Sequence, residues 1–237
     1  MKTDSNVYTI TYATILVIIV AVLLAVVSQV MGPRQQANQR LDVQKQILTA
    51  LNVDYSNADP AALYEQIVEE QNFGELPLYV ANIDGATKYV LRLKGQGLWG
   101  AIWGYVALDE DKNTIYGINF GNEGETPGLG AEIVTENFRS RFFGKHINDA
   151  NGQFRSVAVL KAGKKADEGQ EQVDAWAGAT ITSTGVNDML FNSLSEYAEF
   201  LGQTKKCCSH NMNCNGETAC PKDSVQLNEE MEVENAE

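Results

Sequence analysis

The stretch AIWGYVALDEDKNTIYGINF, residues 101–120, contains two runs rich in aliphatic and aromatic residues on either side of a short polar loop. The loop, DEDKN at residues 109–113, is made of side chains that favour turns or solvent over the interior of a strand. Two β-rich runs that flank such a loop predict an antiparallel hairpin. The rest of the fold can be built outward from this hairpin.

Two further β-rich runs precede the hairpin, LPLYVANID at residues 76–84 and TKYVLRLKG at residues 87–95. After it, helical patterns occupy residues 132–143 and 186–201, and another strand is predicted at residues 154–160. Strands with peripheral helices, without regular alternation of strand and helix, predict a single α+β domain with an antiparallel-rich sheet.

The N-terminal segment predicts a transmembrane helix. No side chain between Ser5 and Pro33 is charged, and this apolar stretch exceeds the ~20 residues that span a bilayer. A cleaved signal peptide is the main alternative, because Lys2 provides a positive start and residues 25–28 resemble a cleavage site. The apolar core of this segment exceeds the usual ~7–15 residues of a signal peptide, which favours an uncleaved anchor.

These patterns divide the chain into four segments. We expect an N-terminal stub and transmembrane helix at residues 1–33, connector helices at 34–72, the folded domain at 73–202 and a polar tail at 203–237. Gly32 and Pro33 predict a break after the anchor. Asp59 and Pro60 predict the N-cap and first residue of a connector helix.

The predicted tail contains an acidic run and four cysteines, Cys207, Cys208, Cys214 and Cys220. Their spacing fits neither paired zinc knuckles nor a c-type haem signature, so we predict no metal site. A loose oxidisable tail is favoured over an iron–sulfur or metal site, and in an exported domain two disulfides are also possible.

The overall charge argues against one class of partner. The chain has a formal net charge of −13 and no lysine- or arginine-rich block, so the basic surface expected for nucleic-acid binding is missing. Arg34, Arg40 and Lys45 follow the apolar span, whereas Lys2 alone precedes it. The positive-inside rule, taken alone, would therefore leave the domain in the cytoplasm.

Three glycine-bearing stretches are candidates for a binding site: KGQGLWG at residues 94–100, ETPGLGAE at 125–132 and DAWAGATITSTGV at 174–186. Each has a structural explanation, namely a strand end, a tight turn, and a helix start capped by Thr182, Ser183 or Thr184. Alternatively, the glycines leave the backbone free of side chains, so that a flat ligand can approach it and its N–H groups can bind an anion. ETPGLGAE has neither the G-x-G-x-x-G spacing of a dinucleotide site nor the GK[ST] ending of a P-loop.

The third stretch carries a specific resemblance. DAWAGAT, residues 174–180, resembles the flavinylation signature D-x-x-[ST]-G-A-T, except that Ala177 stands where Ser or Thr is usual. The three stretches and residues 105–120, in this order behind one anchor, resemble the C subunit of the sodium-translocating NADH:quinone oxidoreductases. The G subunit of the ion-translocating ferredoxin:NAD reductases shares two of these elements and is the alternative.

The resemblance implies an FMN-binding domain in a multi-subunit complex of the bacterial inner membrane that oxidises NADH, reduces quinone and translocates sodium. It implies that a flavin transferase joins FMN to Thr180 through a phosphoester, and that the flavin carries one electron at a time. It also implies that the domain lies on the periplasmic side and that the stub before the transmembrane helix is cytoplasmic, against the charge count. A membrane-anchored assembly module without flavin, or non-covalent FMN, are the competing hypotheses.

The resemblance and the residue types together give an expected flavin site, in which no residue acts as an acid or base because only electrons move. Thr180 is the attachment point. The phosphate is expected near Gly178, Ala179, Thr182 and Ser183, and the flavin ring is expected against Leu98 and Trp99. The polar edge of the ring or the ribityl chain is expected near Glu125, Thr126, Gly128 and Leu129. Lys161 is expected near the phosphate or the ring.

Overall fold

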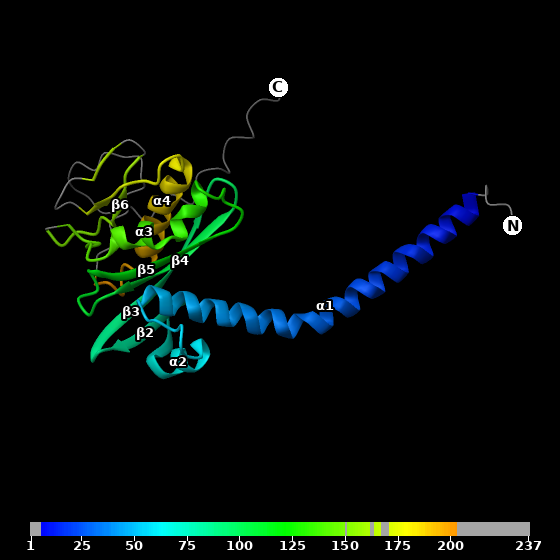
Figure 1. Cartoon of the computed structure of the whole chain (residues 1–237), viewed down its shortest axis with the longest axis horizontal. Helices are drawn as coiled ribbons and strands as arrows, with labels where there is room; N and C mark the ends of the chain where they lie inside the picture. The colour runs from blue at the N-terminus through cyan, green and yellow to red at the C-terminus, as the bar shows by residue number, and fades with distance from the viewer. Residues whose placement is uncertain (1–5, 150, 162–163, 167–170, 203–237) are drawn as a thin grey trace, which may run out of the picture.

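A computed structural model describes residues 6–149, 151–161, 164–166 and 171–202. Helix α1 (Asn6–Ala50) projects away from the folded domain and joins it through its C-terminal end (Figure 1). Its apolar part has a mean hydropathy of 3.0 and is not buried against the rest of the chain. By length and composition α1 is able to cross a membrane, as the sequence predicts. The predicted tail at 203–237, with its four cysteines, lies outside the described residues.

The predicted break at Gly32 and Pro33 is wrong, because α1 continues through Pro33 to Ala50. A proline inside a helix removes one N–H donor and crowds the preceding turn, which bends a helix without necessarily ending it. The ribbon of α1 changes direction partway along its length (Figure 1). One bent helix therefore replaces the anchor and the first connector helix.

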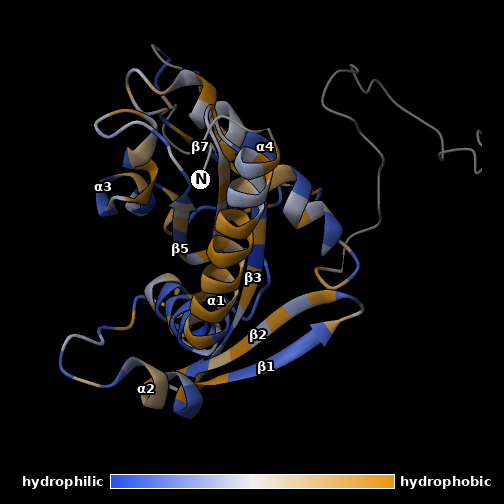
Figure 2. Ribbon diagram, turned by 90° about the vertical axis from the view of Figure 1, so that its right-hand side faces the viewer, coloured by the Kyte–Doolittle hydropathy of each residue, from blue (hydrophilic) through white to orange (hydrophobic). Residues whose placement is uncertain are grey.

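The five-stranded sheet is antiparallel throughout and follows chain order. Its strands are β1 (Val68–Phe73), β2 (Leu76–Ile83), β3 (Ala86–Gln96), β4 (Ala101–Leu108) and β5 (Ile115–Asn122). The predicted hairpin is confirmed as β4 and β5, with a register shift between Ala107 and Leu108. Strand β1 is not predicted by the sequence, because its residues are mostly polar and exposed (Figure 2). The α+β fold class is confirmed.

Both faces of the sheet are covered. Alternate residues of β3 and β4 point to opposite sides, so Leu91 and Ile102 join one core while Val90 and Tyr105 join the other. Helix α4 (Thr180–Glu196) covers the first face. The end of α1 and helix α2 (Pro60–Ile67) cover the second face (Figure 1). Leu48 of α1 is fully buried there.

The remaining elements are short. The predicted helix at residues 132–143 is confirmed as three helical segments, η1 (Gly130–Val134), α3 (Glu136–Arg139) and η2 (Ser140–Phe142). The predicted strand at residues 154–160 is reduced to β6 (Ala158–Val159), which pairs in parallel with β7 (Gln172–Val173). The N-cap at Asp59 is confirmed, since its side chain accepts a hydrogen bond from the N–H of Ala61.

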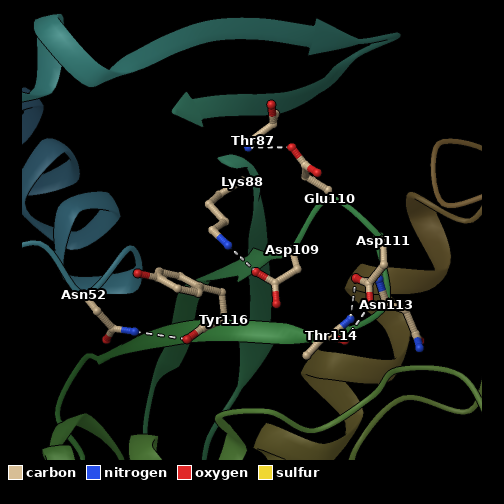
Figure 3. A network of polar contacts seen from close by, with 9 residues as sticks. All are labelled: Asn52, Thr87, Lys88, Asp109, Glu110, Asp111, Asn113, Thr114 and Tyr116. Atoms are coloured by element: carbon tan, nitrogen blue, oxygen red, sulfur yellow. Dashed lines mark hydrogen bonds and ion pairs between the residues drawn. The ribbon is translucent and has the colours of Figure 1, made fainter. Parts of the chain in front are cut away.

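A polar network fixes the loop of the β4–β5 hairpin (Figure 3). Asp111 closes the loop by accepting hydrogen bonds from the N–H groups of Asn113 and Thr114. Asp109 pairs with Lys88 of β3. On the other strand, the amide of Asn52, just beyond α1, donates to the carbonyl of Tyr116 at 3.0 Å. The loop is thus tied to the neighbouring strand, and β5 to the end of the long helix.

Candidate functional site

Helix α4 begins at Thr180, six residues before the predicted start at residue 186. Its N-cap is Ala179, which provides no side-chain cap. The prediction that Thr182, Ser183 or Thr184 caps this helix is wrong, because all three lie inside its first turns. The first N–H groups of a helix lack intrahelical acceptors and form the positive end of its dipole. The start of α4 can therefore bind an anion.

The four hydroxyl side chains of this turn have different surroundings. Thr182 is 1% exposed and donates to Oε2 of Glu125 at 2.6 Å. Ser183 is equally buried, and its Oγ accepts from the N–H of Trp176 at 3.3 Å. Thr184 is exposed and donates to the carbonyl of Thr180 at 2.9 Å. Thr180 is exposed at the first position of the helix.

Glu125 is 6% exposed, and its carboxylate accepts hydrogen bonds from the other two glycine-bearing stretches, through Trp99 and Thr182. Its Oε1 accepts a 2.9 Å hydrogen bond from the N–H of Trp99. Burial by itself would raise the pKa of Glu125, but the hydrogen bonds from Thr182 and from the backbone of Trp99, Leu98 and Gly100 outweigh it, so the pKa is lowered. The carboxylate is thus ionised at neutral pH.

Two glycines allow the backbone to approach this carboxylate. A Cβ atom at Gly97 would collide with Oε1 of Glu125, and one at Gly130 would collide with Oε2 and with the hydroxyl of Thr182. Gly97 belongs to KGQGLWG and Gly130 to ETPGLGAE. Together with Thr182, they bring the three glycine-bearing stretches around a single carboxylate.

Two hollows meet at Thr180 and Ile181, which line both. The first, of about 200 Å³, is called the Glu125 pocket; its other lining residues are Leu98, Glu125, Thr126, Leu129, Gly130, Gly178, Ala179 and Thr182. The second, of about 360 Å³, is called the Lys161 pocket; its other lining residues are Gln96, Lys161, Thr184, Gly185 and Asp188. Thr180 therefore lines both a hollow that contains the carboxylate of Glu125 and a hollow that contains the oppositely charged side chains of Lys161 and Asp188.

The structure brings most of the predicted site residues into these two pockets. Three predicted residues, Trp99, Ser183 and Gly128, line neither pocket. Trp99 is 69% exposed, and its backbone N–H donates to Glu125, whereas Ser183 is buried. The backbone N–H of Gly128 donates to the carboxylate of Glu132 at 3.0 Å. The residues that sequence reasoning missed are Gln96, Gly130, Ile181, Thr184, Gly185 and Asp188. Helical spacing from Thr180 would have indicated Thr184 and Asp188, had the helix start been placed correctly.

The segment before Thr180, residues 174–179, is contacted by Arg141 of η2. A guanidinium N–H of Arg141 donates to the carbonyl of Asp174 at 3.1 Å, and the guanidinium lies 5.4 Å from the ring centroid of Trp176. On the other side, Asn187 of α4 accepts from the N–H of Val159 at 3.1 Å. This bond fixes β6, and with it the neighbouring Lys161, against α4.

The residues present fit FMN. Leu98, Trp99, Leu129 and Ile181 are between 42% and 69% exposed, which gives a flat apolar ring system a surface to cover. The uncapped start of α4 and Lys161 suit a phosphate. The polar side chains of Glu125 and Thr126, which line the Glu125 pocket, suit the hydroxyl groups of a ribityl chain.

Comparison with known proteins agrees with this fit. Residues 97–195 match the family model of the FMN-binding domain, which identifies FMN as the cofactor. In the crystal structure of the C subunit of the Na(+)-translocating NADH-quinone reductase from Parabacteroides distasonis, the matched chain is 43% identical, with a TM-score of 0.65, over 72% of this chain and 96% of that one.

Curated relatives have the same description. The C subunit of the Na(+)-translocating NADH-quinone reductase from Haemophilus ducreyi is 29% identical over 78% of this chain and 88% of its own length. The corresponding protein from Vibrio vulnificus is 40% identical over 51% of this chain, and the match spans about half of that relative (46%). On the fold, the site and these matches, the chain belongs to the family formed by the C subunits of the Na(+)-translocating NADH-quinone reductases.

Proposed function

We propose that this chain is the FMN-carrying electron-transfer subunit of an NADH:quinone oxidoreductase complex, and that the flavin is joined through a phosphoester to Thr180. The observation that carries the proposal is the position of Thr180. It is the exposed first residue of an uncapped helix and lines both pockets. An external enzyme can reach its hydroxyl, and a group attached there can enter either hollow.

The attachment is a substitution at phosphorus. The hydroxyl oxygen of Thr180 bonds to the FMN phosphorus of an activated donor such as flavin adenine dinucleotide, AMP leaves, and the hydroxyl proton is released. The product keeps one negative charge on the phosphate, which the first N–H groups of α4 and the ammonium group of Lys161 stabilise. The proposed modifying partner is a flavin transferase.

Bound FMN supplies the capacity to accept and donate single electrons, and the protein supplies position and electrostatics. Leu98, Leu129 and Ile181, which are exposed at the site, would cover apolar ring surface and exclude water from it. No side chain of the site needs to move a proton. Since the apolar part of α1 contains no charged residue, sodium translocation in the complex is assigned to other subunits.

The proposed orientation places the domain on the periplasmic side of the bacterial inner membrane, where the proposed flavin transferase would act. Arg34, Arg40 and Lys45 oppose this assignment by the positive-inside rule, but long domains cross largely regardless of such charges. Protease added to intact spheroplasts is expected to degrade the domain. Protection of the domain until the membrane is opened would overturn the orientation.

The attachment is tested by the intact mass of the full chain, co-expressed with a flavin transferase. The expected adduct equals FMN less one water, and it is expected to be absent from Thr180→Ala. Thr184→Ala is the matched control, since it removes another exposed hydroxyl one turn along the helix and should retain the adduct. Yellow colour that is lost on denaturation would replace covalent by non-covalent FMN, and a colourless protein would favour an assembly module.

A further inference from the structure

The Glu125 pocket contains a fixed negative charge. Among the described residues that line this pocket, Glu125 is the only one with an ionisable side chain. Its carboxylate is buried, and Thr180, the proposed attachment residue, lines the same hollow. A flavin attached at Thr180, with its ring over Leu98 and Leu129 of the same lining, would be held near this charge.

The charge of Glu125 is solvated by the protein and is not cancelled by it. The donors to its two oxygens are the hydroxyl of Thr182 at 2.6 Å and the N–H of Trp99 at 2.9 Å, and the N–H groups of Leu98 and Gly100 also contribute. All four donors are neutral. Three successive backbone N–H groups form a concave anion site that stabilises a carboxylate without neutralising it.

We propose that Glu125 lowers the reduction potential of the bound flavin. This inference rests on the proposed attachment of FMN at Thr180. An electron added to the flavin increases the negative charge in the pocket, and the fixed carboxylate opposes that increase. At an effective dielectric constant of ~20, two unit charges ~10 Å apart repel enough to change an equilibrium constant roughly tenfold.

Glu125 also positions the site. Its carboxylate joins the turn at residues 98–100 to the start of α4, and Glu125 itself opens the turn that contains Gly130. A variant that disturbs this geometry could change the flavin environment without any effect of charge. The experiment therefore compares variants that remove the charge with variants that keep it.

The test is an equilibrium redox titration of the FMN-loaded full chain in detergent, against a reference dye at pH 7. At a fixed solution potential, Glu125→Gln is expected to raise the ratio of reduced to oxidised flavin about tenfold. Glu125→Asp, which keeps the charge, should remain within about threefold of the wild type. Glu132→Gln is the matched control, because Glu132 bonds the N–H of Gly128 on the same turn but does not line the Glu125 pocket.

Equal shifts in Glu125→Gln and Glu125→Asp, or a shift in Glu125→Gln no larger than in Glu132→Gln, would overturn the proposal. If Glu125→Gln does not fold, Thr182→Val decides, since it removes a neutral donor and retains the carboxylate. Its flavin potential is expected to equal or lie below that of the wild type, and a raised potential contradicts the inference. A wild-type protein without an FMN adduct would instead refute the proposed attachment.

Discussion

The hydroxyl of Thr182 donates a 2.6 Å hydrogen bond to the carboxylate of Glu125, a residue 57 positions earlier in the chain, and both side chains are buried. This bond connects the start of α4 to the turn that follows β5. It therefore holds together the two sides of the Glu125 pocket.

Thr182→Val should destabilise the fold. Valine keeps the shape of threonine but leaves a buried carboxylate oxygen without its hydroxyl donor, which costs about 1.5–3 kcal/mol. Denaturant unfolding of the full chain in detergent, followed by near-UV circular dichroism, measures the loss. Thr184→Val, at an exposed position on the same helix, should change the free energy of unfolding by less than about 0.5 kcal/mol. Equal losses in the two variants would contradict the structural role of this bond.

Stability should fall in acid partly through Glu125. Its folded-state pKa lies below the ordinary value of 4.5, so the stabilisation is present above pH 4.5 and is lost as the pH falls through the folded-state pKa. Glu125→Gln should therefore lose less stability than the wild type between pH 5 and the acid limit of the measurement. The pKa of Asp111 is also lowered, so in both proteins the protonation of Asp111 still contributes to the fall of stability with falling pH. Melting temperatures across this pH range test the difference, and parallel curves would contradict it.

The sequence predicts the fold class and the β4–β5 hairpin because hydrophobic patterns and turn residues act locally. It does not predict β1, whose polar residues are held by pairing with β2. The sequence also misplaces the start of α4, for a related reason. Ala179 is not a capping residue type, so no local signal identifies Thr180 as the first residue of the helix.

The candidate site is only partly predictable. The three glycine-bearing stretches indicate bare backbone, and the resemblance selects Thr180, but neither indicates what the glycines approach. In the structure, Gly97 and Gly130 make room for the carboxylate of Glu125. This is a contact between segments distant in sequence, and spacing along one chain does not specify such a contact.

Arg141→Met should slow attachment of the flavin. Arg141 donates to the carbonyl of Asp174 and lies over the ring of Trp176, so its loss frees the segment that leads to Thr180. Disorder costing about 1 kcal/mol would reduce the initial rate of adduct formation about fivefold. The rate is measured by intact mass at limiting transferase. Arg155→Met is the control, because Arg155 is a surface residue paired with Asp149, and an equal slowing there would exclude a specific role for Arg141.

The end of α1 should be part of the folded domain as well as its link to the anchor. Leu48 has none of its surface accessible to solvent and lies in the core that contains Val90 and Tyr105. Leu48→Ala should therefore cost about 2–5 kcal/mol in the free energy of unfolding. Leu24 lies in the part of α1 that projects from the domain and is 63% exposed. Leu24→Ala should therefore leave the free energy of unfolding of the domain unchanged in detergent.

The same packing sets the limit for a truncated chain. A protein that begins at residue 34 keeps the buried end of α1 and should unfold cooperatively, with a melting temperature close to that of the full chain. A protein that begins at residue 54 lacks Ile47, Leu48 and Leu51, which are fully buried, and exposes the apolar sheet face that they cover. It should bind a hydrophobic dye and melt at a lower temperature. Equal melting of the two truncated proteins would show that α1 contributes only the anchor.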